Sequence, residues 1–197
     1  MIILARHGQT SANAGGLLLG RADLPLTEVG RRQAQALAGA VTSAHRVISS
    51  PLRRATETAA AFGLPVEVDE RWVEVDYGEY DQRPLGSVPE EIWRMWRADP
   101  EYRPPGGESF AAVAERVREA CDGLMGEAST SDIVVVSHVS PIKEAVAWAL
   151  GVSGQIAWRM HLNVAAISRL GCGPRGTSLL SFNETSHLLA VATSGTA

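Results

Sequence analysis

Basic side chains stand at the ends of three predicted strands. Arg6 and His7 directly follow the apolar run "MIILA", Arg53 and Arg54 come shortly after "RVIS", and His138 directly follows "DIVVVS". Ligands of open α/β sheets bind beside the carboxyl ends of the strands, so we expect these side chains to converge there. Arginine matches phosphate oxygens in pairs, and histidine can act as a nucleophile. The spacing therefore predicts a phosphate site.

Two of the basic segments lie beside predicted helix starts. Ser50–Pro51 and Ser140–Pro141 each combine an N-cap residue with a proline suited to the first helical position. Helix N-termini carry unpaired N–H groups and the positive end of the helix dipole, which favour anions. Gly8 has no side chain, so the backbone there is expected to approach a ligand closely.

A carboxyl pair lies between the basic segments, in "RWVEVDYGEY". Glu74 and Asp76 are two residues apart, so in an extended segment they would share one face. A carboxyl beside a basic pocket is a candidate proton donor. The alternative is that both belong to a solvated strand face.

Hydrophobic periodicity and cap signals predict the elements that position these residues. Thr27 is the expected N-cap of a helix over about 28–41, and residues 8–25 form a long loop. The last dozen residues are small and polar, and we expect them to fray. Strands are expected at 1–6, 46–49, 132–137, 163–169 and 178–183, and residues 65–68 and about 72–76 are expected to be extended. Further helices are expected at 51–62, 88–98, 109–125 and 140–150.

The alternation of strands and helices predicts an α/β fold: a three-layer sandwich with a mostly parallel central sheet flanked by helices. A length of 197 residues suits one domain. The net charge is −4 and there is no block of Lys and Arg, which argues against nucleic acid. No apolar run approaches the ~20 residues of a membrane span, and no signal peptide is recognisable. Two cysteines, Cys121 and Cys172, form no disulfide framework, so we expect a cytoplasmic protein.

The chain resembles the histidine phosphatase superfamily, also called phosphoglycerate mutase-like. "ARHGQTSAN" resembles the signature R-H-G-[EQ]-[ST]-x-x-N, and "GRADLPLTEVGRRQAQALA" resembles G-x-x-D-x-P-L-T-x-x-G-x-x-Q-A. "SSPLRRATETA" is similar to S-x-L-x-R-A-x-x-T-A, and "EVDYG" to the acid motif E-x-x-[FY]-G. "PGGES" and "VSHVSPIK" resemble later family landmarks, so the resemblance covers residues 1 to about 145.

The resemblance implies a role for each matched position. His7 is the implied nucleophile that becomes phosphohistidine, and Glu74 is the implied acid and base. Arg53 is one position off the motif and is expected at the surface or behind the site. The phosphoryl oxygens would be held by Arg6, Arg54 and His138, and the other implied substrate-binding residues are Gln9, Thr10, Asn13 and Val139.

No step of this chemistry requires a cofactor or a metal. A neutral histidine nitrogen attacks phosphorus and divides one hard step into two easier ones. The transferred group is rich in negative charge, so positioning and charge stabilisation do most of the work. We find no metal-ligand spacing among the five histidines, and we expect His45, His161 and His187 to be structural or surface residues.

The chain departs from the family pattern at two places. Val139–Ser140 stand where the family usually has two glycines, and because valine disfavours positive φ, the backbone there is expected to differ. Gln82 stands where the family often has glycine, which bears on a lid-like segment at about 79–107. Trp93 and Trp96 are three apart on a predicted helix, and core packing is favoured over contact with an apolar substrate group.

Three functions compete. The first is a phosphatase acting on small phosphomonoesters, with α-ribazole phosphatases and broad-specificity phosphatases as equally similar branches. The second is a cofactor-dependent phosphoglycerate mutase, but residues 79–105 carry four Arg against six acidic residues, which suits a doubly charged substrate poorly. The third is a non-catalytic phosphate-binding module, which the presence of every matched catalytic residue disfavours. A small-molecule phosphate ester is thus the expected partner, and a homodimer is left open.

Overall fold

The strand that leads into Arg6, β1 (Ile2–Arg6), lies inside a six-stranded sheet in the computed structural model, which describes residues 1–193. The strand order is β3-β2-β4-β1-β5-β6, and the pairs from β3 through β1 are parallel, whereas β5 runs antiparallel to β1 and β6 to β5. The other strands are β2 (Ala44–Ser49), β3 (Val66–Val68), β4 (Asp132–Ser137), β5 (Ile167–Gly173) and β6 (Gly176–Glu184).

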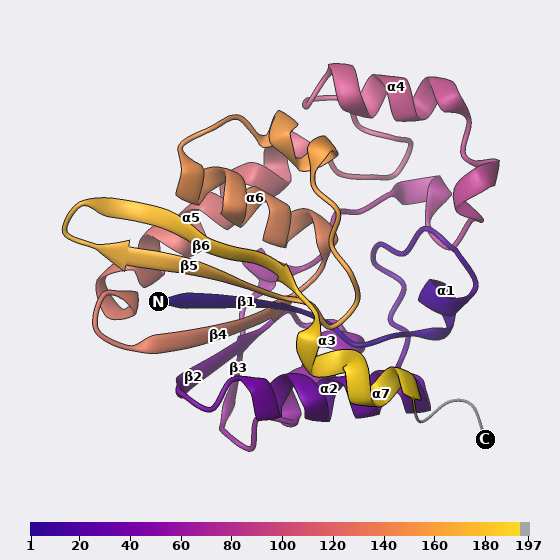
Figure 1. The fold of residues 1–197 in the computed structure, drawn as a ribbon. Helices are drawn as coiled ribbons and strands as arrows, with labels where there is room; N and C mark the ends of the chain where they lie inside the picture. Colours follow the sequence, from indigo (N-terminus) through magenta and orange to yellow (C-terminus); the bar gives the residue numbers. More distant parts are fainter. Residues whose placement is uncertain (194–197) are drawn as a thin grey trace.

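Helices cover both faces of this sheet, as Figure 1 shows. The α-helices are α1 (Ser11–Ala14), α2 (Glu28–Ala40), α3 (Arg53–Ala60), α4 (Glu90–Ala98), α5 (Phe110–Ala128), α6 (Val139–Leu150) and α7 (Leu189–Thr193). Short 3₁₀ helices are η1 (Glu70–Trp72), η2 (Gly78–Tyr80), η3 (Leu85–Ser87), η4 (Gly154–Arg159) and η5 (Ser186–Leu188). The predicted three-layer α/β sandwich with a mostly parallel sheet is confirmed.

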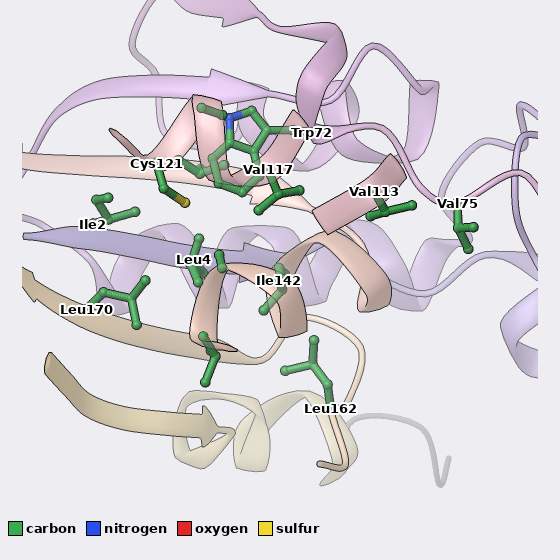
Figure 2. Close-up of a cluster of buried hydrophobic side chains, with 14 of the residues drawn as sticks. Ile2, Leu4, Trp72, Val75, Val113, Val117, Cys121, Ile142, Leu162 and Leu170 are labelled. Carbon is green, nitrogen blue, oxygen red and sulfur yellow. The ribbon is translucent and has the colours of Figure 1, made fainter. Parts of the chain in front are cut away.

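Two hydrophobic cores hold the layers together. Side chains of β1 alternate between them, because successive residues of a strand point to opposite faces. Ile2 and Leu4 pack toward α5 and α6 beside Trp72 (Figure 2), whereas Ile3 packs with Leu37 of α2 on the other face. Both central strands, β1 and β4, are apolar on both faces, which is why their sequences read as continuous apolar runs.

The helix starts after β2 and β4 differ from the prediction. α3 begins at Arg53 rather than Pro51, and Ser50 is not its N-cap. The Ser50 hydroxyl instead lies 2.7 Å from Nε2 of His138, so it serves the candidate site. α6 begins at Val139 with His138 at the N-cap position, and Pro141 falls within the first helical turn, where no N–H is required.

Three other segments also differ from the sequence-based prediction. Trp72 lies in η1 and residues 73–77 pair with no strand, so the predicted extended run at 72–76 is not part of the sheet. The predicted loop at 8–25 contains α1, which Thr10 caps. Residues 186–193 form η5 and α7 rather than a frayed end, and the remainder of the predicted frayed end lies outside the described residues. Across residues 1–193, we find no helix with the length and apolarity needed to cross a membrane.

Gly8 contacts protein rather than open space. A Cβ built on Gly8 would lie 2.4 Å from the carbonyl oxygen of Gly30, and a Cβ on Gly30 would lie 2.1 Å from the carbonyl oxygen of Gln9. Two glycines therefore let the segment after β1 pack backbone to backbone against α2. The expectation that Gly8 admits a ligand is corrected: its missing side chain fixes the segment that carries His7.

Candidate active site

The carboxyl end of β1 opens onto a cavity of about 460 Å³, here called the His7 cavity. Its position agrees with the rule that ligands of such sheets bind beyond the carboxyl ends of the strands. Of the nine residues with an implied site role, five line it, namely Arg6, His7, Asn13, Glu74 and Val139, whereas Gln9, Thr10, Arg54 and His138 do not. The structure thus brings together residues that are up to 133 positions apart in the sequence. This convergence was predicted from their positions at the ends of strands.

His7 binds the backbone through one ring nitrogen. Its Nδ1 lies 2.7 Å from the carbonyl oxygen of Gly8, and because a carbonyl only accepts, Nδ1 carries the proton. Burial, and then the charges of Arg54 and Arg6, hold the pKa of His7 well below its usual range. The ring is therefore neutral at neutral pH, and Nε2, which has no partner among residues 1–193, offers a lone pair.

His138 lies behind His7, with the two ring centroids 5.1 Å apart. Its Nδ1 accepts a hydrogen bond from Nε of Arg54 at 3.2 Å, so Nε2 carries the proton and donates to the Ser50 hydroxyl at 2.7 Å. Burial first, and then Arg54, lower the pKa of His138 well below its usual range. A neutral imidazole thus links the buried guanidinium of Arg54 to Ser50.

Arg54 is fully buried and is held by the loop at 20–22. Its Nη2 donates to the carbonyl of Gly20 at 2.7 Å, and its Nη1 donates to the carbonyl of Ala22 at 2.8 Å. Asp81 holds the same loop from the other side, because its carboxylate accepts from the N–H groups of both residues. A guanidinium has five N–H groups, so two of those of Arg54 are left over after these contacts and the one with His138.

Arg6 brings a second guanidinium to the His7 cavity. Its Nη1 donates to the carbonyl of Leu162 at 2.7 Å, whereas its Nε has no partner among the described residues. Burial lowers the pKa of Arg6 to about 10, which leaves it charged at neutral pH. The site therefore holds two arginine cations beside a neutral histidine nucleophile, an arrangement that favours binding of an anion.

The carboxyl of Glu74 lies at the N-terminus of α6. It accepts hydrogen bonds from the backbone N–H groups of Val139 at 3.0 Å and Ser140 at 3.2 Å. A third hydrogen bond comes from the N–H of Val75 at 2.9 Å, and the three contacts fix the orientation of this carboxyl, which lines the cavity. Asp76 does not share this position: its carboxylate accepts from the N–H of Gly78 at 2.8 Å and caps a turn. Of the predicted pair, Glu74 alone lines the cavity.

Gln9 and Thr10 do not line the His7 cavity. Gln9 accepts a hydrogen bond from the Thr27 hydroxyl through its side chain, and Thr10 is the N-cap of α1. Asn13, which lines the cavity, also closes the α1 capping box by accepting from the Thr10 N–H at 3.0 Å. Gln9 and Thr10 therefore shape the loop that carries Asn13.

Across residues 1–193 there is no group of three or more His, Cys, Asp and Glu side chains placed to hold a metal ion.

The family model of the histidine phosphatase superfamily, branch 1, matches residues 2–185. The chain belongs to this family.

Several relatives cover nearly the whole chain. A bifunctional protein of Mycobacterium tuberculosis is 36% identical over 198 residues, which are 95% of this chain and 54% of that protein. This chain therefore spans about half the length of that relative. Phosphoserine phosphatase 1 of Hydrogenobacter thermophilus is 32% identical over 199 residues, covering 95% of this chain and 93% of that one. A probable phosphoglycerate mutase of Yersinia enterocolitica is 35% identical over 202 residues, covering 95% and 94%.

A solved structure has a closely similar fold. A phosphoserine phosphatase variant from Entamoeba histolytica, in complex with phosphoserine, superposes with a TM-score of 0.87 at 27% identity. The match covers 95% of this chain and 98% of that one. The α/β architecture described above is therefore that of histidine phosphatases.

The rest of the His7 cavity is lined by residues to which the family resemblance assigned no role. Lys143 lies one helical turn after Val139, so the spacing of the two could have predicted it. His161, expected to be structural or at the surface, is exposed but lines the cavity. Trp93 lines the cavity, whereas Trp96 is buried in the core, so the expected core packing holds for Trp96.

The remaining outcomes concern residues outside the cavity. Arg53 is exposed and pairs with Glu57 at 2.6 Å, as expected for a surface residue. His187 lies 2.9 Å from the carbonyl oxygen of Ala165, a structural contact. Gln82 has φ 63°, so it adopts the left-handed conformation that the family's glycine would favour. Val139 has no such strain and begins a helix instead.

Proposed function

We propose that this chain is a phosphatase that hydrolyses small-molecule phosphomonoesters through a phosphohistidine at His7. The observation that carries the proposal is the neutral His7 ring, with an unpartnered Nε2, beside the charged guanidinium of Arg6. Family membership and the phosphoserine phosphatases among its relatives support it.

The proposed reaction has two steps. In the first, Nε2 of His7 forms a bond to phosphorus while the bond from phosphorus to the alcohol oxygen breaks, and protonated Glu74 gives its proton to the departing oxygen. In the second, the Glu74 carboxylate takes a proton from water, and the water oxygen attacks phosphorus. The phosphorus–nitrogen bond then breaks, which releases phosphate and restores neutral His7.

Arg6, Arg54 and His138 are proposed to hold the phosphoryl oxygens. Arg6 has an unpartnered Nε, and Arg54 keeps N–H groups beyond its contacts with the loop at 20–22. His138 donates to Ser50 in the structure, so we propose that a phosphoryl oxygen takes the place of that hydroxyl. Asn13 and Val139 line the cavity and complete the proposed substrate contacts.

Much of the cavity is left for the leaving group. Leu17, Leu85, Trp93 and Trp158 line this part, so we propose a substrate with an apolar portion. Residues 79–107 supply Leu85 and Trp93 and are proposed to act as a lid on a single domain. The acidic balance of that segment favours a phosphatase over a mutase. We also propose that the enzyme is cytoplasmic and needs no metal.

Turnover of p-nitrophenyl phosphate tests the proposal. His7→Ala should lower turnover by several orders of magnitude, because no nucleophile remains. His45→Ala, at an exposed histidine outside the cavity, should leave it unchanged. Rapid quenching of the wild type should trap an acid-labile, base-stable phosphoryl group. Near-normal activity of His7→Ala, or activity lost to EDTA and restored by a divalent ion, would overturn the mechanism.

A panel of metabolite phosphates then identifies the substrate class. It should include phosphoserine, α-ribazole phosphate and both phosphoglycerates. Esters with an apolar leaving group should show the highest kcat/KM, and transfer of phosphate between phosphoglycerates should be slower than hydrolysis. The reverse order would favour the mutase.

A further inference from the structure

A second cavity of about 530 Å³ adjoins the His7 cavity. It is bounded by α5, α6 and η4, and Phe110, Glu144 and Trp158 contribute to the lining of both cavities. None of the residues proposed to bind the phosphoryl group lines it. Its volume is within the range of small-molecule binding sites. The reaction proposed above makes no use of it.

The carboxyl of Glu144 is the unusual group in this cavity. The residue is only 6% exposed, and its carboxyl has no hydrogen bond or ion pair with any described residue. A Cβ built on Gly154 would lie 2.5 Å from Oε2, so the carboxyl rests against bare backbone. Burial raises the pKa of Glu144 to about 7. A largely buried carboxylate with no counter-ion is unfavourable for folding, and because Glu144 lines the cavity, a ligand of opposite charge can reach it.

The walls around Glu144 are aromatic. Trp96, Phe110, Trp148 and Trp158 all line the second cavity. Phe110 and Trp158 meet edge to face, with ring centroids 5.3 Å apart. The indole N–H of Trp148 already donates to Asp122 at 2.8 Å, so that ring offers its apolar surface rather than a donor. Aromatic faces around a carboxylate are the surroundings that favour an ammonium group.

We propose that the second cavity is a separate binding site for a small organic cation, namely an ammonium group on an apolar body. The ammonium group pairs with the Glu144 carboxylate, and the apolar body packs on the tryptophan walls. A neutral ligand would leave the carboxylate without a counter-ion, and an anion would be repelled by it. Because Phe110 and Trp158 also line the His7 cavity, an occupant would contact the wall of the proposed leaving-group region.

Other charged groups near Glu144 do not replace such a ligand. Glu115 and Arg118 of α5 line the second cavity but are exposed, and their opposite charges offset each other. Lys143 precedes Glu144 in α6, but it lines the His7 cavity instead. Arg118 lowers the pKa of Glu144 by its charge, yet burial outweighs it.

Calorimetry with benzylamine and its neutral analogue benzyl alcohol tests this proposal. At about pH 8 the wild type should bind benzylamine at least about tenfold more tightly, equivalent to one ion pair of modest strength. Glu144→Gln should abolish that preference, whereas Glu115→Gln at the rim should retain it. Equal affinity for both compounds, or an unchanged preference in Glu144→Gln, would overturn the proposal.

Two measurements locate the bound benzylamine. Saturating vanadate should leave its affinity unchanged, because vanadate occupies the His7 cavity. Ala114, which lines the second cavity only, offers a variant: Ala114→Phe should fill the space and weaken benzylamine binding more than tenfold. Competition by vanadate would place benzylamine in the His7 cavity and overturn the assignment without needing any variant. Neither readout depends on turnover, so failure of the proposed phosphatase activity would be recognised separately.

Discussion

At the residue scale, the chemistry depends on which nitrogen of His7 carries its proton. The Gly8 carbonyl fixes the proton on Nδ1, and burial with two nearby arginines keeps the ring neutral. We expect ¹⁵N NMR to show the Nδ1–H tautomer, with His7 titrating well below its ordinary pKa of 6.5. The imidazole signals of His7 are assigned by their absence from the spectrum of His7→Gln. An Nε2–H tautomer, or titration at or above the ordinary value, would contradict this account.

Glu74 and Asp76 have similar chemistry but different surroundings. Glu74 lines the His7 cavity, whereas Asp76 caps the turn at Gly78. Loss of a general acid costs about 10²–10⁴-fold, so Glu74→Gln should lower kcat within that range for alkyl phosphates. The loss should be much smaller for p-nitrophenyl phosphate, whose leaving group needs no proton.

Asp76→Asn is the matched control for that experiment. It should alter kcat only mildly with either ester, because its carboxylate serves a turn. If Asp76→Asn were the more damaging change, or if the leaving group made no difference to Glu74→Gln, Glu74 would not be the acid.

At the element scale, the position of His7 depends on the contact between the segment after β1 and α2. Gly30→Ala would place a Cβ 2.1 Å from the carbonyl oxygen of Gln9. This oxygen belongs to the backbone, so it cannot avoid the clash by a simple rotation, as a flexible side chain could. We expect a loss of about 1–3 kcal/mol of unfolding free energy. Activity should fall too, because the displaced segment carries His7.

Gly39→Ala in the same helix is the control. A Cβ there would meet nothing within 4 Å, so alanine should stabilise α2 by up to about 1 kcal/mol. Urea unfolding of both variants measures the difference. Equal stability of the two variants would show that the close contact at Gly30 does not hold the segment.

The elements that the sequence predicted well are those decided by local pattern. Thr27 caps α2 through its hydroxyl, and Val113, Val117 and Cys121 form a buried stripe on α5. Helix starts were misplaced where a tertiary contact competes, because Ser50 is held by His138 instead of capping α3. Periodicity carries no information about such long-range partners.

The site was predictable where it follows parallel strands. The convergence of Arg6, His7 and His138 could be predicted because they stand at or just after the ends of strands whose carboxyl ends share one edge. His161 and Leu162 were not found, because β5 runs antiparallel and brings the residues before it to the same edge. A short apolar run does not indicate the direction of its strand. The part of the His7 cavity that precedes β5 could therefore be identified only from the structure.

At the scale of the whole molecule, Glu144 should tie stability to pH. Its pKa in the folded chain is about 7, above the ordinary 4.5, so the folded state binds more protons between these values and stability falls as pH rises through them. Glu144→Gln removes that dependence. We expect the variant to be more stable than the wild type at about pH 8, by about 1–3 kcal/mol, and nearly equal at about pH 4.5.

Thermal unfolding across this pH range measures the effect. A difference of that size corresponds to a rise in Tm of roughly 3–8 °C for a chain of this length. Other titrating groups act in both proteins, so they largely cancel in the comparison. Benzylamine should narrow the gap at high pH by stabilising the wild type more than the variant, because a ligand that binds the folded state raises its stability, and raises it more the more tightly it binds. A variant less stable than the wild type at high pH would show that the Glu144 carboxylate already has a protein partner, and with it the case for a cation site would fail.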